Sequence, residues 1–175
     1  MKYAGIGSRR TPYDILAMMR NIANDLSSKG YTCRTGGALG ADKAFIDGSS
    51  DSELWLPWDG YNGYYSDLPE PTEVEEAFAA KYHPNWKACK QGARKMHARN
   101  CNIVLGEDLD DPVDFIVCWT PEAKLEGGTA QALRIAIDYD IPVFNLGDKA
   151  GSPYILNKLI EFVKNNEKQH RFSGN

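Results

Sequence analysis

Apolar residues follow two alternating patterns along this chain. Short runs that are apolar at nearly every position are typical of strands buried on both faces. Longer stretches, in which apolar residues return every three or four positions, are typical of helices with one buried face. Strands are therefore expected at residues 2–6, 31–34, 53–57, 113–119 and 141–145, and helices at residues 13–29, 41–50, 72–82, 85–104, 129–139 and 154–165.

The regular alternation of strand and helix predicts an α/β fold. Consecutive parallel strands joined by right-handed helical crossovers form a sheet that is covered on both faces. We expect a three-layer sandwich with a mainly parallel sheet of about five strands. Residues 1–165 form its single domain, whereas residues 166–175 lack a core pattern and are expected to fray.

Glycine-rich turns follow three of the predicted strands, at residues 5–9, 35–37 and 126–129. The carboxyl ends of parallel strands share one edge of a sheet, so these turns are expected to meet there. Free backbone N–H groups at the start of a helix favour an anion, most often a phosphate. The predicted phosphate- or nucleotide-binding residues are Gly5, Gly7, Ser8, Arg9, Thr35, Gly36, Gly37, Gly127, Gly128 and Thr129. Tight strand-to-helix packing is the alternative reason for Gly5 and Gly7.

An aromatic, glycine-containing loop follows the third predicted strand. Its residues Trp58, Tyr61 and Tyr64 are candidates to stack on a nucleotide base. Packing within a lid or at a dimer interface is the alternative, and the sequence does not separate the two.

Composition restricts the class of protein. The chain has 175 residues, 42% of them hydrophobic and 25% charged, which is ordinary for a globular domain that needs no disulfide or metal staple. The N-terminus lacks the pattern of a signal peptide and no apolar run is long enough to cross a bilayer, so a cytoplasmic protein without membrane contact is expected. A net charge of -4 and a pI near 5.4 disfavour nucleic acid as a partner, although local basic patches remain compatible with it.

The cysteines do not suggest a metal or disulfide framework. Cys33, Cys89, Cys101 and Cys118 form no C-x-x-C pair and are expected to be reduced. His97 and Cys101 lie four residues apart on a predicted helix, but no second pair of ligands matches them. We therefore predict no metal site and no cofactor.

Five motifs together resemble a known superfamily. They are Gly5-Ile-Gly-Ser8, Thr35-Gly-Gly-Ala-x-Gly-x-Asp42, Met96-His-Ala-Arg-Asn100, Asp114-Phe-Ile-Val and Gly127-Gly-Thr-x-x-Ala132. They resemble the SLOG-type, Rossmann-like superfamily that includes DNA-processing protein A and the Lonely Guy phosphoribohydrolases, and are most similar to compact single-domain members often found in phages. The resemblance implies binding of a nucleotide, a nucleotide-derived signal or nucleic acid, and implies a homo-oligomer in which a neighbour's helix completes the pocket.

The Lonely Guy branch cleaves the N-glycosidic bond of a nucleoside monophosphate, and its motifs match this chain in part. Arg99 occupies the place of the family's arginine in its Met-x-x-Arg-Lys helix. Asn100 replaces the lysine, and Ala132 stands where the family's glutamate belongs. Because that acid is missing, the resemblance does not carry the activity over.

Other acids are candidates to replace the missing glutamate, because a carboxylate near the sugar stabilises an oxocarbenium-like transition state. Glu126, Asp42 and Glu53 are expected near the same rim, and the predicted catalytic group is Glu126, Arg99 and Asp42. Helix capping by Asp42, a solvated Glu126 and a surface ion pair of Arg99 are the alternatives. Three functions remain open: nucleotide binding with glycosidic cleavage, binding or sequestering of a nucleotide signal without catalysis, and single-stranded DNA binding.

Overall fold

The computed structural model describes the backbone of residues 1–173 and the side chains of residues 1–169. Five parallel strands form one sheet in the order β3-β2-β1-β4-β5. The strands are β1 (Lys2–Gly7), β2 (Thr32–Thr35), β3 (Ser52–Leu54), β4 (Phe115–Trp119) and β5 (Val143–Asn145). The predicted parallel sheet is confirmed.

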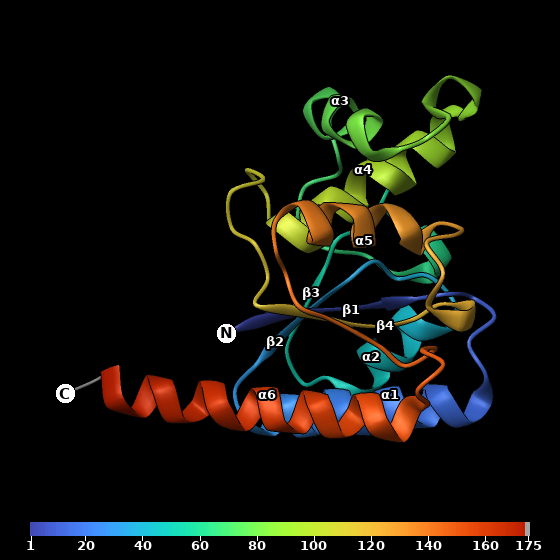
Figure 1. Cartoon of the computed structure of the whole chain (residues 1–175). Coiled ribbons are helices and arrows are strands. Elements are labelled where there is room, and N and C mark those ends of the chain that lie inside the picture. Colours follow the sequence, from blue (N-terminus) through green and yellow to red (C-terminus); the bar gives the residue numbers. More distant parts are fainter. Residues whose placement is uncertain (174–175) are drawn as a thin grey trace.

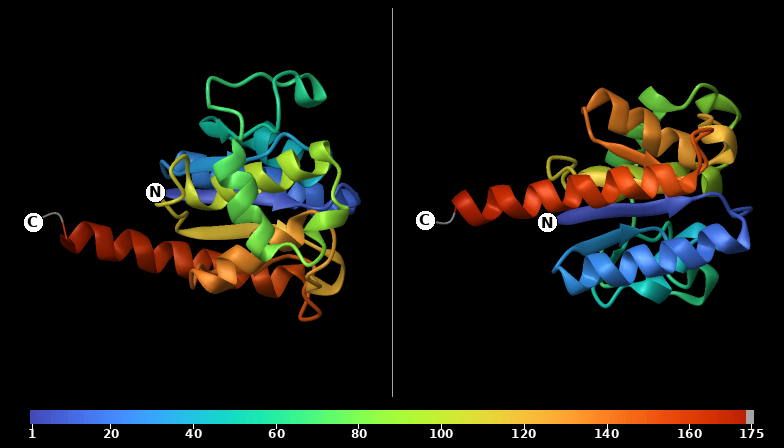
Figure 2. Two further views of the ribbon diagram at one scale, coloured as in Figure 1. Left: turned by 90° about the horizontal axis from the view of Figure 1, so that it is seen from above. Right: turned by 60° about the horizontal axis from the view of Figure 1, so that its bottom comes forward.

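Helices cover both faces of this sheet (Figure 1). On one face lie α1 (Tyr13–Ser28), α2 (Ala41–Gly48) and α6 (Ser152–Ser173), and on the other lie α3 (Glu73–Tyr82), α4 (Gln91–Leu105) and α5 (Thr129–Asp138). Short 3-10 turns are η1 (Tyr61–Gly63), η2 (Trp86–Ala88) and η3 (Pro121–Ala123). The right-hand view of Figure 2, in which the lower layer of Figure 1 comes forward, shows α1 and α6 running side by side on one face of the sheet. Together these elements form the predicted three-layer α/β sandwich.

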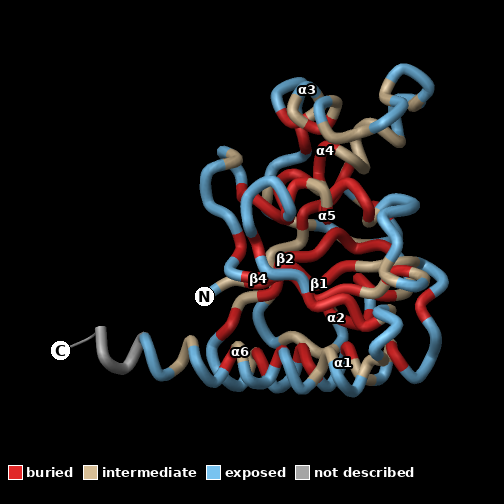
Figure 3. The backbone as a smooth tube through the Cα atoms, viewed as in Figure 1, coloured by how far each residue is buried: buried red, intermediate tan, exposed pale blue. Residues whose placement is uncertain are grey.

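The sheet separates two apolar layers, because side chains of a strand alternate between its faces. On β1, Tyr3 packs with α1, α2 and α6, whereas Ala4 and Ile6 pack with α4 and α5. On β4, Phe115 joins the first layer and Ile116 the second. Both strands are therefore buried on both faces, as Figure 3 shows by the red central strands.

The strand order creates a crevice between β1 and β4. After β1 the chain builds β2 and β3 on one side, then returns to build β4 and β5 on the other. The connections that leave β1 and β4 consequently diverge to opposite sides, and ligands of open α/β sheets bind at such a point. Gly7 pairs with Trp119 where the two strands end, which marks the floor of this crevice.

Two predicted helix boundaries differ most from the structure. The last helix was expected to end near Asn165, but α6 continues to Ser173, so residues 166–173 are helical and only residues 174 and 175 fall outside the description. No Gly or Pro interrupts residues 154–173. After residue 165, Lys, Glu, Gln and Arg favour a helix by their intrinsic propensity, without an apolar pattern in the sequence. The helix expected from Asn85 begins at Gln91, because residues 86–88 form η2 and Cys89 is extended. Among the described helices, none has the length and hydrophobicity needed to span a membrane.

Candidate functional site

A cavity of about 560 Å³ opens where β1 and β4 end. Four segments supply its walls: the turn after β1, the start of α2, the middle of α4, and the loop between β4 and α5. Its lining residues are Ile6, Gly7, Ser8, Arg9, Arg10, Ala38, Asp42, Met96, His97, Arg99, Asn100, Thr120, Pro121, Glu126, Gly127, Gly128 and Thr129.

The turn after β1 is held close to the neighbouring elements. A Cβ atom at Gly7 would lie 2.7 Å from the Ala41 Cβ and 3.0 Å from the Trp119 carbonyl oxygen, so only glycine fits without moving β1. Ser8 continues the pairing, since its N–H donates to the Trp119 carbonyl at 3.1 Å. Beyond it, Arg9 is exposed at the rim, and its guanidinium donates to the Tyr61 hydroxyl at 3.3 Å. The turn therefore presents Ser8 and Arg9 to the cavity on a fixed backbone.

Arg99 and Asp42 form a buried ion pair in the cavity wall. Arg99 Nη1 lies 3.4 Å from Asp42 Oδ2, and their side chains are 7% and 4% exposed. Asp42 also accepts the Ala38 N–H at 3.2 Å. The guanidinium occupies the space above Gly36, where a Cβ atom would lie 1.1 Å from Nη1. Burial raises the pKa of the Asp42 carboxyl above its ordinary value, although the positive charge of Arg99 opposes this rise.

The start of α5 forms the opposite wall. Gly127 has a left-handed backbone with φ of +73°, and Cβ atoms at Gly127 and Gly128 would meet no other described atoms within 4 Å. The backbone here is therefore open to a ligand, and the first N–H groups of a helix have no partner within it. Asn100 Nδ2 donates to the Gly128 carbonyl at 3.1 Å, which ties this loop to α4.

The cavity is positively charged overall. Three arginines and two acids line it, which leaves one net positive charge when both acids are ionised. His97 does not add to it, because burial, with the nearby His83, lowers the pKa of its imidazole below the ordinary value. Arginines beside a helix N-terminus favour a small anion, and phosphate matches both the fork of a guanidinium and the backbone N–H groups.

Most of the predicted site residues meet at this cavity. Its lining includes the predicted binding residues Gly7, Ser8, Arg9, Gly127, Gly128 and Thr129, together with the predicted catalytic residues Glu126, Arg99 and Asp42. Four other predicted binding residues, Gly5, Thr35, Gly36 and Gly37, lie behind it.

These four residues support the site through packing. At Gly5 a Cβ atom would lie 2.4 Å from the Phe45 ring. Glycine is therefore needed at this position to leave room for the buried Phe45 side chain, which is the packing alternative. Thr35 is fully buried. Gly37 has φ of +70° and packs against Leu56, and Gly36 makes room for the Arg99 guanidinium described above.

The three base-stacking candidates form a small core of their own. Trp58, Tyr61 and Tyr64 pack with Ala38, Leu56, Leu54 and Met96. The Trp58 and Tyr61 rings meet edge to face at 5.3 Å, and the Arg99 guanidinium lies 5.8 Å from the Tyr61 ring centre. Tyr61 is buried and Trp58 and Tyr64 are half-buried in this cluster, which agrees with the lid-packing alternative. Tyr61 does not line the cavity but contacts two of its arginines. Its hydroxyl accepts a hydrogen bond from Arg9, and its ring packs against the Arg99 guanidinium.

Glu53 does not lie at the cavity, contrary to expectation. It pairs with Arg34 at 2.6 Å and with Lys2 at 3.1 Å, and Arg34 also binds Asp111. Although burial raises the pKa of Glu53, hydrogen bonds from Arg34 and Lys2 lower it below the ordinary value. Arg34 is only 2% exposed, so this network stabilises the sheet and holds the carboxylate away from the site.

Several lining residues were not predicted. Met96, His97 and Asn100 share α4 with Arg99, and a helical projection of the Met96–Asn100 motif places them within one turn of it. Thr120 directly follows β4, as ligand-binding residues in parallel sheets often do. It is buried and locked to Asn145, whose Nδ2 donates to its Oγ1 at 2.8 Å.

Neither the protein-family models nor the curated proteins that were compared with this sequence match it. Two solved structures match the fold. DNA processing protein A from Helicobacter pylori, which binds single-stranded DNA, is 20% identical with a TM-score of 0.59, covering 97% of this chain and 81% of that one. The Moco carrier protein of Chlamydomonas rheinhardtii is 18% identical with a TM-score of 0.51, covering 90% of this chain and 83% of that one. The fold is thus Rossmann-like.

Proposed function

We propose that this chain binds a small phosphorylated ligand of the nucleotide class in the cavity between β1 and β4. The observation that carries the proposal is the buried Arg99, which faces the same cavity as the Ser8–Arg9 turn and the start of α5. Each of these groups favours a phosphate, and together they offer it donors from three sides. A volume of about 560 Å³ lies within the range typical of small-molecule sites.

Cleavage of an N-glycosidic bond is a second candidate function. Asp42 and Glu126 line the same cavity, one buried with a raised pKa and the other exposed. Two carboxyl groups in different environments suit a reaction in which one stabilises the developing positive charge on the sugar and the other handles a proton. We assign the first role to Glu126 and the second to Asp42, with Arg99 holding the phosphate.

Single-stranded DNA binding is a third candidate, favoured by the exposed Arg9 and Arg10 at the rim. The net charge of -4 weighs against an extended nucleic-acid footprint. A gel shift with an oligonucleotide, repeated at increasing salt, tests this candidate. Retardation that weakens steeply with salt and disappears in Arg9→Ala/Arg10→Ala supports it, and no retardation at low salt rejects it.

Ligand binding is tested by thermal unfolding with the nucleoside 5'-monophosphates, the matching nucleosides and inorganic phosphate. Nucleotides are expected to raise the melting temperature, while nucleosides without phosphate are not, since the phosphate supplies the binding energy. Mass spectrometry of molecules that co-purify with the chain would identify the natural ligand. If no phosphorylated compound shifts the melting temperature, the binding proposal is wrong.

Catalysis is tested separately by chromatography of each nucleotide after incubation with the protein. Release of free base that is lost in Glu126→Gln supports the glycosidase. The matched control is Glu122→Gln, because Glu122 is another exposed acid of the same loop but does not line the cavity. Tight binding with the nucleotide recovered intact would instead identify a binding or sequestering protein.

A further inference from the structure

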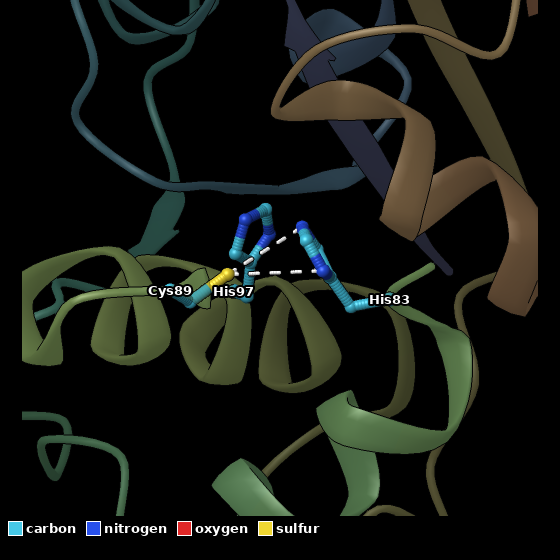
Figure 4. A group of neighbouring side chains, drawn as sticks. All are labelled: His83, Cys89 and His97. Carbon is cyan, nitrogen blue, oxygen red and sulfur yellow. Dashed lines mark hydrogen bonds between the residues drawn. The ribbon is translucent and has the colours of Figure 1, made fainter. Parts of the chain in front are cut away.

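A second cluster of chemically reactive side chains lies where residues 83–89 meet α4, beside His97. His83 directly follows the end of α3, Cys89 follows η2, and His97 belongs to α4. One potential ligand atom from each lies within 4.8 Å of the other two. Figure 4 shows the Cys89 sulfur directed toward the His83 ring, with the His97 ring beside them. The His83 and His97 ring centres are 4.4 Å apart.

The spacing of this cluster matches that of metal ligands. Cys89 Sγ lies 3.7 Å from each ring nitrogen of His83. In a tetrahedral zinc site, Zn–S and Zn–N bonds of about 2.3 and 2.0 Å place sulfur and nitrogen about 3.6 Å apart. The separation therefore fits a zinc ion bonded to Cys89 and to one His83 nitrogen, once the His83 ring has turned so that the lone pair of that nitrogen faces the ion.

Aromatic packing surrounds the cluster, and one imidazole nitrogen of His97 lacks a hydrogen bond of ordinary geometry. The Trp86 ring packs beside both histidines, at 6.0 Å from the His83 ring and 6.4 Å from the His97 ring. Arg94 covers Trp86 at 5.5 Å. His97 Nδ1 is buried and makes no hydrogen bond of ordinary geometry among the described residues, although the Gln131 side chain lies close enough to act on the pKa of this ring. A buried polar atom without a partner destabilises the fold, and a bound cation would remove that penalty.

We propose that His83, Cys89 and His97 bind one zinc ion, with a fourth position open to water or to a ligand atom. One thiolate and two imidazoles form a borderline-soft donor set that selects zinc over magnesium or calcium. Binding releases the thiol proton of Cys89 to solvent, so affinity falls as the pH is lowered. The ion joins residues 83–89 to α4. It also places a positive charge next to His97, which lines the anion cavity.

The proposal departs from the prediction of no metal site, and it does not use the pair whose spacing was noted in the sequence, His97 and Cys101. The thiol of Cys101 donates to the His97 carbonyl oxygen at 3.6 Å and is completely buried in the core. It therefore points away from the cluster. The residue that completes the site is Cys89, which lies eight positions before His97 and reaches it because η2 turns the chain back toward α4.

The test uses the full-length chain, stripped of metal and titrated with cobalt(II). A single equivalent is expected to produce the visible bands of tetrahedral cobalt together with a near-ultraviolet thiolate-to-cobalt charge-transfer band, and zinc is expected to displace it. Cys89→Ser should lose the charge-transfer band, and His83→Ala should weaken binding at least tenfold. Cys101→Ala is the matched control, because it removes a thiol that does not belong to the cluster, and it should retain the spectrum.

Two outcomes of the cobalt titration overturn the proposal: no stoichiometric cobalt band in the wild-type chain, or a charge-transfer band that persists in Cys89→Ser. Circular dichroism shows whether each variant is folded. As a second measurement, zinc should raise the melting temperature of the wild-type chain and of Cys101→Ala, but not that of His83→Ala, whose half-buried ring lies at the end of α3. An equal rise in all three also rejects the site. The result does not depend on which ligand the cavity binds.

Discussion

Replacing Arg99 with methionine separates the charge of the proposed anion site from its shape. Methionine retains much of the length of the side chain and removes the guanidinium that lies above Gly36. A hydrogen bond from a charged group contributes about 1.5–3 kcal/mol, and each 1.4 kcal/mol is a factor of ten in affinity. We therefore expect the dissociation constant of a nucleoside monophosphate to rise by about 10- to 100-fold.

The same substitution removes the partner of Asp42. Breaking a buried pair costs about 3–5 kcal/mol, and protonation of Asp42, which keeps its hydrogen bond from Ala38, reduces this to about 2–4 kcal/mol. The folded-state pKa of Asp42 is already raised. Its contribution to stability is therefore complete below the ordinary carboxyl pKa of about 4 and is lost as the pH rises through the raised value. The destabilisation of Arg99→Met should accordingly grow from acidic to neutral pH.

Asp42→Asn is the companion variant, because it keeps the shape of the side chain and removes its negative charge. Affinity for the same anion is expected to increase, since Arg99 then lacks a competing carboxylate. Isothermal titration calorimetry measures the affinities, and urea unfolding at several pH values measures stability. If both variants weaken binding to the same extent, or if Arg99→Met binds as tightly as the wild type, Arg99 is not the anion anchor.

Three further predictions follow from contacts around the site and within the fold. Gly36→Ala should displace the Arg99 guanidinium and weaken anion binding about tenfold, and unchanged calorimetry would contradict this. Arg34→Met should reduce the free energy of unfolding by about 2–4 kcal/mol at neutral pH. Because Glu53 has a lowered pKa, its stabilisation exists above the ordinary carboxyl value and is lost as the pH falls, so the two urea midpoints should converge in acid. Thr72→Ala removes a capping box and should lower the melting temperature by about 2–4 °C in calorimetric scans, whereas a variant as stable as the wild type would argue against the cap.

The fold was largely predictable because burial on both faces leaves a strong trace in the sequence. Residues 115–119 of β4 are apolar almost throughout, and the apolar spacing of α1 predicted its extent to within one residue. The largest error, at the end of α6, occurs where the sequence lacks an apolar pattern. Residues 166–173 of α6 have no apolar periodicity, so their helix depends on intrinsic propensity, which is a weaker signal.

The site was predictable where a turn follows a strand and unpredictable where long-range packing decides. Ser8 and Gly128 reach the cavity because parallel strands end at one edge. Tyr61 was a candidate either to stack on a base or to pack within a lid, and it packs against two arginines. Its position depends on how the loop after β3 folds against α4, and aromatic composition alone does not reveal that contact.

The order of residues along the chain was enough to predict the alternation of strands and helices, the parallel sheet and the edge where the glycine turns meet. Each of these features depends on the spacing of residues that are close together in the sequence. The pairing of Asp42 with Arg99, and the approach of Cys89 to two histidines, join residues that belong to separate elements. Such contacts depend on how α4 packs against α2, α3 and the sheet. Only the folded arrangement brings these groups within bonding distance, so only it distinguishes a candidate ligand from an ordinary charged or sulfur-containing side chain.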